Sequence, residues 1–257
     1  MGKESIKVVA MSDLHGILPP SNTIPKCDLV LIGGDICGHH GIFDQSVWLY
    51  DTFRPWLENL PAERVVGVAG NHDFIWEKSP HLVPKLPWIY LQDNMYTYKG
   101  WKIYGSPWQL RFYDWAFNLD EPEIERKWNL IPDDVDILVL HGPPKFFGDK
   151  VTSIKSGEDG FAGSLSLTNR IRVIQPKLVV FGHIHPGFGI YEENGTILAN
   201  VSLVDNKYLW KNHPVQFTLD TERKETISLV KNTSEDNFTK KVTVWNNQYD
   251  KTNTKLT

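Results

Sequence analysis

The sequence predicts an α/β fold with a two-sheet core that is flanked by helices. Five short apolar runs each lead into a polar loop that contains glycine, and segments with helical character lie between several of these runs. Repetition of strand, loop and helix is typical of α/β proteins whose sheets are covered by helices. Hydrophobic residues make up 41% of the 257 residues, which is ordinary for a globular protein with a proper core.

The expected strands and helices follow the apolar runs and the glycine and proline residues that end them. Five buried strands are expected at residues 6–11, 29–32, 65–69, 137–140 and 178–181. Helices are expected at about 44–60, at 122–129 and at 165–174, the last of which ends before Pro176. Shorter apolar runs, which we expect to build a second sheet, lie at 88–91, 96–98, 102–105, 197–201 and 215–219.

The domain organisation follows from a change in composition near the C-terminus. Residues 1–230 contain the regular pattern and are assigned to one domain. From about residue 231 the chain becomes rich in Asn, Thr and Lys and loses its apolar periodicity, so residues 231–257 are assigned to a polar extension. Within that extension, one additional edge strand is an alternative at Val242, Val244 and Trp245.

The loops after the five buried strands carry the residues that predict chemistry. They read "SDLHG", "GGDICG", "GNHD", "HGPP" and "GHIHPG". In α/β folds the ligand site lies beyond the carboxyl ends of the strands, where these loops fall. The metal-capable side chains of the five loops are Asp13, His15, Asp35, Asn71, His72, His141, His183 and His185.

This mixed set of oxygen and nitrogen donors suits divalent ions such as Mn, Fe, Ni, Co or Zn. One structural zinc ion needs four ligands, so seven or eight are too many for it. Two adjacent ions that share a carboxylate would use them all. Pairs of ions of this kind stabilise the attacking and leaving oxygens during phosphoryl displacement.

Composition excludes other classes of function. The formal net charge of −4 gives no electrostatic footprint of a protein that binds duplex nucleic acid. No run reaches the ~18 apolar residues that a membrane span needs, and the N-terminus shows no signal-peptide core. Cys27 and Cys37 are interpreted as reduced thiols. We therefore expect a cytoplasmic enzyme with a small-molecule substrate. The sequence is also compatible with a homodimer.

Taken together, the blocks D-x-H, GD, GNHD, H-G and G-H-x-H resemble the calcineurin-like metallophosphoesterases over residues 6–220. Within that superfamily, "YGSPW" at 104–108 and "KWNLIP" at 127–132 are similar to the metallophosphoesterase-domain-containing (MPPED-type) branch, which is related to class III cyclic nucleotide phosphodiesterases. Some members of this branch replace the first histidine of the last block by glycine, whereas this sequence keeps His183. The resemblance implies a four-layer αββα sandwich of two mixed β-sheets, with the metal site at the carboxyl ends of the strands.

The resemblance also implies roles for the strand-end residues. One ion would be held by Asp13, His15 and His185. The other ion would be held by Asn71, His141 and His183, with Asp35 bridging the pair.

His72 is then not a ligand and acts on the phosphate, either by stabilising its charge or by protonating the leaving alkoxide. Asp73 is assigned to the catalytic set too; it either orients His72 or caps the helix that follows, and we favour the cap. Water between two cations exists as hydroxide near neutral pH and can attack phosphorus in line. An imidazole with a pKa near 6.5 can supply the proton to the leaving group.

The expected activity is hydrolysis of small phosphodiesters by a binuclear, metal-dependent phosphodiesterase, with manganese the metal most suited to assays. Trp108 and Phe112 can stack on a base while Arg111 binds the phosphate. The alternative is that these aromatic residues only pack against one another within a loop that covers the site. A small aromatic pocket fits a nucleotide better than a phosphoprotein. The resemblance points the same way, toward 2′,3′- or 3′,5′-cyclic nucleotides.

Three alternatives remain beside this interpretation. A phosphomonoesterase or protein phosphatase shares the metal blocks, but a protein phosphatase should have an arginine where this chain reads "GDICGHH". The metallo-β-lactamase fold also uses an HxH motif, but there the motif is followed directly by Asp-His. Here Pro186 and Gly187 follow instead, so this fold is set aside. A non-catalytic binding scaffold is disfavoured because the set of metal-capable residues is intact.

Overall fold

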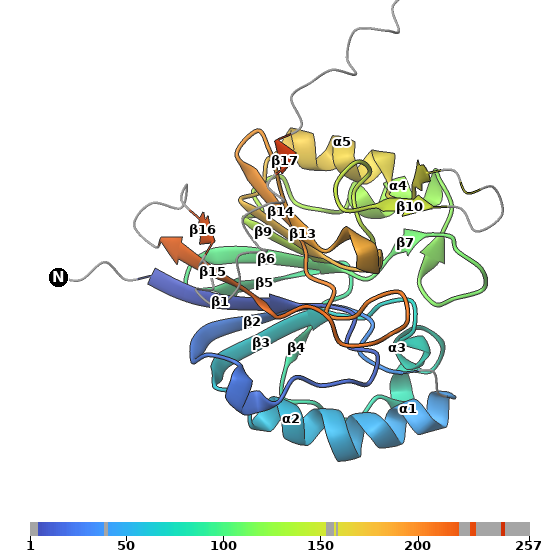
Figure 1. Cartoon of the computed structure of the whole chain (residues 1–257), viewed down its shortest axis with the longest axis vertical. Helices are drawn as coiled ribbons and strands as arrows, with labels where there is room; N and C mark the ends of the chain where they lie inside the picture. The colour runs from blue at the N-terminus through green and yellow to red at the C-terminus, as the bar shows by residue number, and fades with distance from the viewer. Residues whose placement is uncertain are drawn as a thin grey trace, which may run out of the picture.

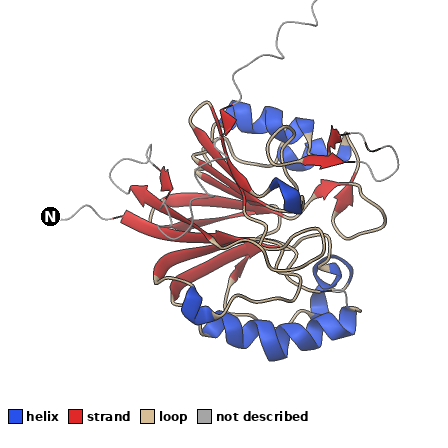
Figure 2. Ribbon diagram, in the orientation of Figure 1, coloured by secondary structure: helices blue, strands red, loops and turns tan. Residues whose placement is uncertain are grey.

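Two β-sheets pack face to face, and helices cover the outer face of each sheet (Figures 1 and 2). The computed structural model describes residues 5–38, 41–152, 157, 159–220, 227–229 and 243–244. This arrangement confirms the predicted α/β fold with two mixed sheets between layers of helices. His39 and His40, and most of the extension at 231–257, lie outside the described residues.

The first sheet has six strands in the order β16-β15-β1-β2-β3-β4. Its parallel strands are β1 (Ser5–Met11), β2 (Cys27–Gly33), β3 (Ala62–Val68) and β4 (Ile89–Tyr90). Beyond β1 the sheet continues in antiparallel fashion with β15 (Val215–Asp220) and β16 (Ile227–Leu229).

The second sheet has seven strands in the order β17-β13-β14-β12-β9-β6-β5. Its four central strands are parallel: β6 (Trp101–Ser106), β9 (Ile137–Leu140), β12 (Leu178–Phe181) and β14 (Thr196–Asn200). The outer strands are β5 (Asn94–Tyr98), β13 (Gly189–Glu193) and β17 (Thr243–Val244). Two small sheets pair β7 (Gln109–Leu110) with β8 (Asn118–Leu119), and β10 (Lys150–Thr152) with β11 (Asp159–Phe161).

The five predicted buried strands are all present, but the prediction that the shorter runs build the second sheet was wrong for two of them. Residues 89–90 pair with β3, and residues 215–220 pair with β1, so both lie in the first sheet. The second sheet instead contains two of the five buried runs, β9 and β12. Local pattern identifies a strand, but its neighbour is chosen by long-range pairing that no local pattern specifies.

The helices agree with the predicted positions. The first expected helix is one continuous segment made of α1 (Ile42–Trp48), the π-helical turn η2 (Leu49–Phe53) and α2 (Arg54–Glu58). The other two expected helices are α4 (Glu123–Trp128) and α5 (Leu165–Ile174). Shorter helical pieces are η1 (Ser21–Thr23), α3 (Phe74–Lys78), η3 (Pro80–Leu82) and η4 (His185–Gly187). No helix in the described ranges is long and apolar enough to cross a membrane.

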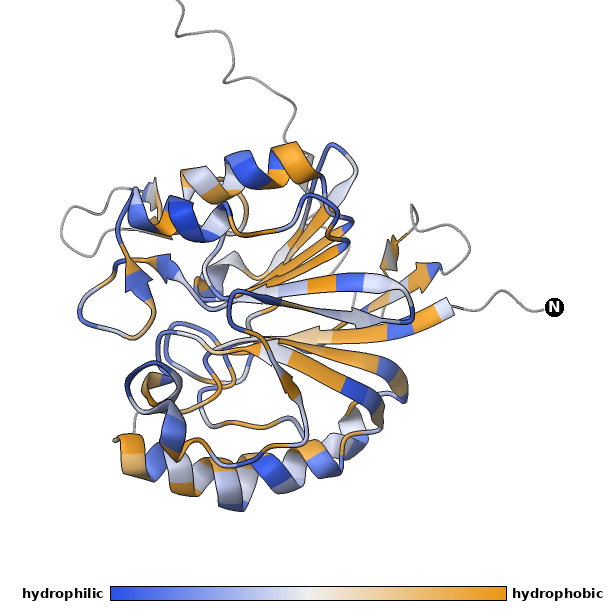
Figure 3. Ribbon diagram, turned by 180° about the vertical axis from the view of Figure 1, so that it is seen from behind, coloured by the Kyte–Doolittle hydropathy of each residue, from blue (hydrophilic) through white to orange (hydrophobic). Residues whose placement is uncertain are grey.

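Alternation along the strands creates separate cores between the layers. Successive side chains of a strand point to opposite faces. In β1, Ile6, Val8 and Ala10 lie between the two sheets, whereas Val9 and Met11 face the layer of α1 and α2. A third core fills the space between the second sheet and helices α4 and α5. Figure 3 shows hydrophobic residues along the strands of both sheets.

A short bridge joins the two sheets where their parallel strands end. Ser12, just after β1, pairs with Ser202, just after β14. The Ser12 N–H donates to the Val201 carbonyl at 3.0 Å, and the Leu203 N–H donates to the Ser12 carbonyl at 2.9 Å. The loops that follow the strands of both sheets are therefore brought to one place.

Candidate metal centre

The eight strand-end residues singled out from the sequence come together in this structure. They follow the carboxyl ends of five parallel strands, β1, β2, β3, β9 and β12. Asp13 and Asp35 are 0% and 1% exposed, and His141 is fully buried. Their side chains form one continuous cluster of carboxylate, amide and imidazole groups, which the contacts below define.

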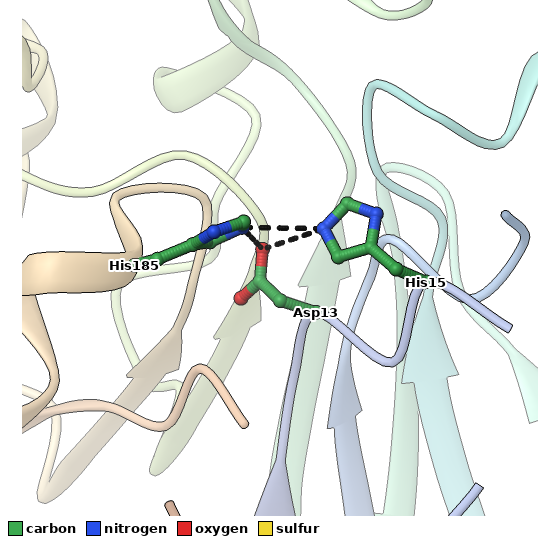
Figure 4. A group of neighbouring side chains, drawn as sticks. All are labelled: Asp13, His15 and His185. Atoms are coloured by element: carbon green, nitrogen blue, oxygen red, sulfur yellow. Dashed lines mark hydrogen bonds and ion pairs between the residues drawn. The ribbon is translucent and has the colours of Figure 1, made fainter. Parts of the chain in front are cut away.

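Asp13, His15 and His185 form the first group of ligand atoms (Figure 4). The Nε2 atoms of the two histidines lie 3.2 Å apart, and His185 Nε2 lies 3.3 Å from Asp13 Oδ1. The Nδ1–H of His185 donates to the Asp205 carbonyl at 3.0 Å, which directs Nε2 into the centre. Burial acts to lower the pKa of His185, but its hydrogen bond to Asp13 and the charge of that carboxylate outweigh burial, so the pKa is raised above its usual value.

Asn71, His141 and His183 form the second group. Asn71 Oδ1 lies 2.8 Å from His141 Nε2 and 2.7 Å from His183 Nδ1. Burial lowers the pKa of His141, and burial lowers the pKa of His183 to about 3, so the imidazole of His183 is neutral at neutral pH. His141 donates its Nδ1–H to the Gly33 carbonyl at 2.8 Å, so its Nε2 lone pair faces the Asn71 oxygen. Two acceptors aimed at each other fit a cation between them.

Asp35 lies between the two groups. Its Oδ1 is 3.4 Å from His141 Nε2, and its Oδ2 is 3.5 Å from His15 Nε2. Burial and the charges of Asp13 and Asp73 raise the pKa of Asp35 well above its usual value, because Asp35 is buried close to two other carboxylates. The cluster therefore has the donor atoms, the burial and the charge of a site for divalent metal.

Four of the eight residues adopt a backbone conformation that is unfavourable for side chains with a Cβ. Asp13, His15, Asp35 and His183 have φ angles of 56°, 43°, 50° and 69°. The left-handed region costs a non-glycine residue roughly 1–2 kcal/mol. Strain of this kind persists where the surrounding structure fixes it, and such sites are commonly functional.

Asp73 connects the two loops that follow β2 and β3. Its carboxylate accepts N–H groups from Ile36 at 3.0 Å, Cys37 at 2.8 Å and Gly70 at 2.7 Å. It stands at the N-cap position of α3, but its side chain does not cap the helix. Burial raises the pKa of Asp73 to about 6. Asp73 thus fixes the distance between the loop of Asp35 and the loop that follows β3, and its assignment to the catalytic set stays a prediction.

Gln45 of α1 performs the capping that was expected of Asp73. Its Oε1 accepts the Ile75 N–H at 3.0 Å, and its Nε2 donates to the His72 carbonyl at 2.7 Å. This fully buried side chain was not singled out from the sequence. A glutamine on an amphipathic helix looks like a surface residue, so no local signal identified it.

His72 lies at the edge of the cluster. Its backbone N–H donates to Asp35 Oδ1 at 2.8 Å, and its Nε2 lies 4.0 Å from Asp35 Oδ2. Its ring meets that of His15 edge-on, with 4.5 Å between centroids. His72, His15 and Asp35 also satisfy the distances of a metal-binding group. The geometry is therefore compatible with a ligand and with a catalytic imidazole, and metal content separates the two.

The residues predicted to contact substrate have other partners in this structure. Arg111 pairs with Asp120 at 2.7 Å, and the Trp108 indole N–H donates to Asp93 at 2.9 Å. The ring of Phe112 packs on Tyr113 with 4.3 Å between centroids. Their role in binding substrate stays a prediction. From the same stretch of chain it is Trp115 whose ring contacts His72, at 4.1 Å between centroids.

Polar residues after β14 support Asp13 and were missed in the sequence. Ser202 Oγ lies 2.7 Å from Asp13 Oδ2 and 2.8 Å from Asn200 Oδ1, so these two acceptors share its single O–H. The signal was present, because the shorter apolar run at 197–201 leads into the polar residues of "ANVSLVD". Since β14 is parallel to β12, its carboxyl end lies at the same edge of the sheet.

Comparison with known proteins identifies the family. The family model for calcineurin-like phosphoesterases matches residues 6–187. The chain is 35% identical to metallophosphoesterase domain-containing protein 1 of Homo sapiens, over 84% of this chain and 72% of that protein. It is 29% identical to a UPF0046 protein of Caenorhabditis elegans, over 84% of this chain and 82% of that protein. One crystal structure, 14% identical, aligns with a TM-score of 0.59 over 89% of this chain and 99% of the other, which is a likeness of fold.

Replacement of Asp35 tests the position between the two groups. Because its two oxygens face different groups, Asp35→Asn should lower the metal content more than His15→Ala, which removes a ligand from one group. Metal per protein chain, measured by mass spectrometry after dialysis, gives the result. An Asp35→Asn protein that keeps two tightly bound ions contradicts the bridging position.

The strained backbone at His183 gives a second test. In metal-free protein, His183→Gly should be roughly 1 kcal/mol more stable than His183→Ala, since only glycine adopts a positive φ without strain. Both variants lose the same imidazole, so their metal contents should match. Urea unfolding in the presence of chelator measures the difference. Equal stability of the two variants would show that position 183 is not strained.

Proposed function

The chain belongs to the calcineurin-like phosphoesterase family and is a metal-dependent phosphoesterase; we propose that it hydrolyses small phosphodiesters with the help of two divalent ions. The observation that carries this proposal is the position of Asp35, which has one carboxylate oxygen toward His141 and the other toward His15. A carboxylate placed in this way is suited to bridging two cations. The donor set of carboxylate, amide and imidazole suits Mn, Fe, Zn, Ni or Co.

The assignment of ligands follows the two groups of contacts. Asp13, His15 and His185 would hold one ion, and Asn71, His141 and His183 the other. When bound, the ions supply Lewis-acid activation of water and neutralise charge on the phosphoryl oxygens. The chain keeps the ligand rings oriented, because the Nδ1–H groups of His141 and His185 are fixed by the carbonyls of Gly33 and Asp205.

His72 is proposed to protonate the leaving alkoxide. A protonated imidazole next to the phosphate can donate its proton to the departing oxygen. The backbone of His72 is held on both sides, by its N–H bond to Asp35 and by Gln45 at its carbonyl. Since the turn is fixed before substrate arrives, little reorganisation is needed to place the ring.

The substrate is proposed to be a small diester, and specifically a 2′,3′- or 3′,5′-cyclic nucleotide. Support comes from the depth of the centre, where His72 and Asn71 are each 4% exposed, so that a bulky phosphoprotein is a poor fit. The relationship of the branch to class III cyclic nucleotide phosphodiesterases points the same way. A cytoplasmic location, and the division into a domain at residues 1–230 and an extension at 231–257, are further parts of the proposal.

Metal removal tests the activity directly. Chelation should abolish hydrolysis of bis-p-nitrophenyl phosphate and of cyclic nucleotides, and added manganese should restore it, because the ligand atoms alone supply no electrophile. The assay should include p-nitrophenyl phosphate, a monoester with the same leaving group. Full activity in protein verified to be free of metal contradicts the role of metal. Faster hydrolysis of the monoester than of the diesters would show that the protein is a phosphomonoesterase and not a phosphodiesterase.

Replacement of His72 separates a catalytic imidazole from a ligand. His72→Ala should keep both ions and reduce kcat for a cyclic nucleotide by roughly 10²–10⁴-fold, the usual value of general acid–base catalysis. The loss should be smaller for bis-p-nitrophenyl phosphate, because p-nitrophenolate leaves without a proton.

His183→Ala is the matched control, since loss of a ligand should lower metal content and slow both substrates alike. If His72→Ala loses metal, the residue is a ligand. If it keeps metal but slows both substrates equally, the proton-donor role is wrong and stabilisation of phosphoryl charge remains.

A further inference from the structure

Two aromatic side chains contact the imidazoles of the metal centre from different parts of the chain. The ring of Trp115 lies 4.1 Å from that of His72, tilted by 42°. The ring of Tyr208 lies 4.7 Å from that of His15 and 5.5 Å from that of His185, both edge-on. Trp115 comes from the loop between β7 and β8, and Tyr208 from the segment after β14. Figure 1 shows both segments at the end of the molecule where the parallel strands stop.

Hydrogen bonds tie the Trp115 loop to a residue of the metal centre. The N–H of Ala116 donates to the carbonyl of Asn71 at 3.1 Å, and Gln109 Nε2 donates to the carbonyl of Ala116 at 2.6 Å. Ala116 and Phe117 are fully buried, which anchors the loop directly after Trp115. The indole is therefore positioned by the same turn that presents Asn71 and His72.

The turn that carries Tyr208 is connected to His185. The Asp205 carbonyl accepts both the N–H of Tyr208 at 2.9 Å and the Nδ1–H of His185 at 3.0 Å. The Asp205 side chain accepts the N–H groups of Lys207 and Leu209, which closes the turn. Tyr208 has a φ of 58°, a conformation that this closed turn imposes. A ring held in this way loses little freedom when it binds a ligand.

We propose that Trp115 and Tyr208 form an aromatic rim that binds an aromatic ring carried by the phosphoester substrate and so determines its specificity. Tyr208 is 36% exposed, whereas His15 beneath it is 8% exposed, so accessible aromatic surface adjoins a buried polar centre. The centre is suited to the phosphate, and the rim to a flat ring attached to it. Aromatic side chains stack on any nucleobase or aryl group. This inference rests on the proposed function.

Affinity for two phosphonates that differ only in the ring tests the rim. Phenylphosphonate and methylphosphonate present the same charged head group to manganese-loaded protein, and calorimetry measures their dissociation constants without turnover. Wild-type protein should bind phenylphosphonate more tightly. Trp115→Ala and Tyr208→Ala should each weaken phenylphosphonate by roughly 5- to 100-fold, the range expected for loss of one stacking ring, with less than about a threefold change for methylphosphonate.

Conservative and remote variants control for unrelated effects. Trp115→Phe and Tyr208→Phe keep a ring and should keep most of the preference for phenylphosphonate. Phe43→Ala removes an aromatic ring that is 74% exposed on α1, and should change neither constant. Metal content should be unchanged in all variants. The dissociation constant of adenosine 5′-monophosphate, measured in parallel, shows whether the rim prefers a nucleobase or a simple aryl ring.

The outcomes distinguish the rim from the proposed function. Equal affinity of wild-type protein for both phosphonates, or alanine variants that keep the preference, would falsify the rim even if diesters are hydrolysed. Loss of kcat in Trp115→Ala with unchanged phenylphosphonate affinity also overturns it, since the indole would then act only by positioning His72. If the protein does not hydrolyse diesters but still prefers phenylphosphonate to methylphosphonate, the proposed activity is rejected and the aromatic rim is supported.

Discussion

Two carboxylates buried close together, Asp13 and Asp35, impose the constraint on which the rest of this structure depends. Their ligand atoms lie within 4.8 Å of each other. At an effective dielectric constant of about 20, two unit negative charges at that distance repel by about 3 kcal/mol. Burial alone acts to raise the pKa of both, yet the pKa of Asp13 is held far below its usual range by His185 and its neighbouring histidines. Divalent cations remove this repulsion and convert it into attraction.

The surrounding chain is organised to keep these groups together. Ser202 and the N–H of His183 bind Asp13, and the N–H of His72 binds Asp35. Glycine precedes several of the ligands for steric reasons. A Cβ at Gly70 would collide with Asp35, and one at Gly182 would collide with Asp13. The close approach of the loops therefore requires glycine, and part of the stability gained in the three cores offsets strain at the centre.

The same arrangement divides chemistry from recognition. The groups proposed to act on phosphate are buried and lie on turns that begin directly at strand ends. Trp115 and Tyr208 lie on longer connections, which changes in sequence can alter without moving the strands. A family that keeps the metal blocks can therefore vary the organic part of its substrate through these connections. In this chain the connections hold aromatic rings against the imidazoles, which favours flat substituents next to the phosphate.

The sequence by itself determined the fold class, the five strands with their polar ends, and the cluster that those ends form. It could do so because apolar runs and glycine turns are local, and because the carboxyl ends of parallel strands in one sheet lie at the same edge. The two sets of ends, from β1–β3 and from β9 and β12, meet because the sheets are joined at Ser12 and Ser202. Tertiary structure decided what depends on distant contacts. The pairing of β15 with β1, the use of Asp73 to join two loops, and the capping of α3 by Gln45 all depend on segments far apart in sequence. Trp115 rather than Trp108 contacts His72 because Asp93 and Lys127 occupy the Trp108 indole, and no local pattern encodes that choice.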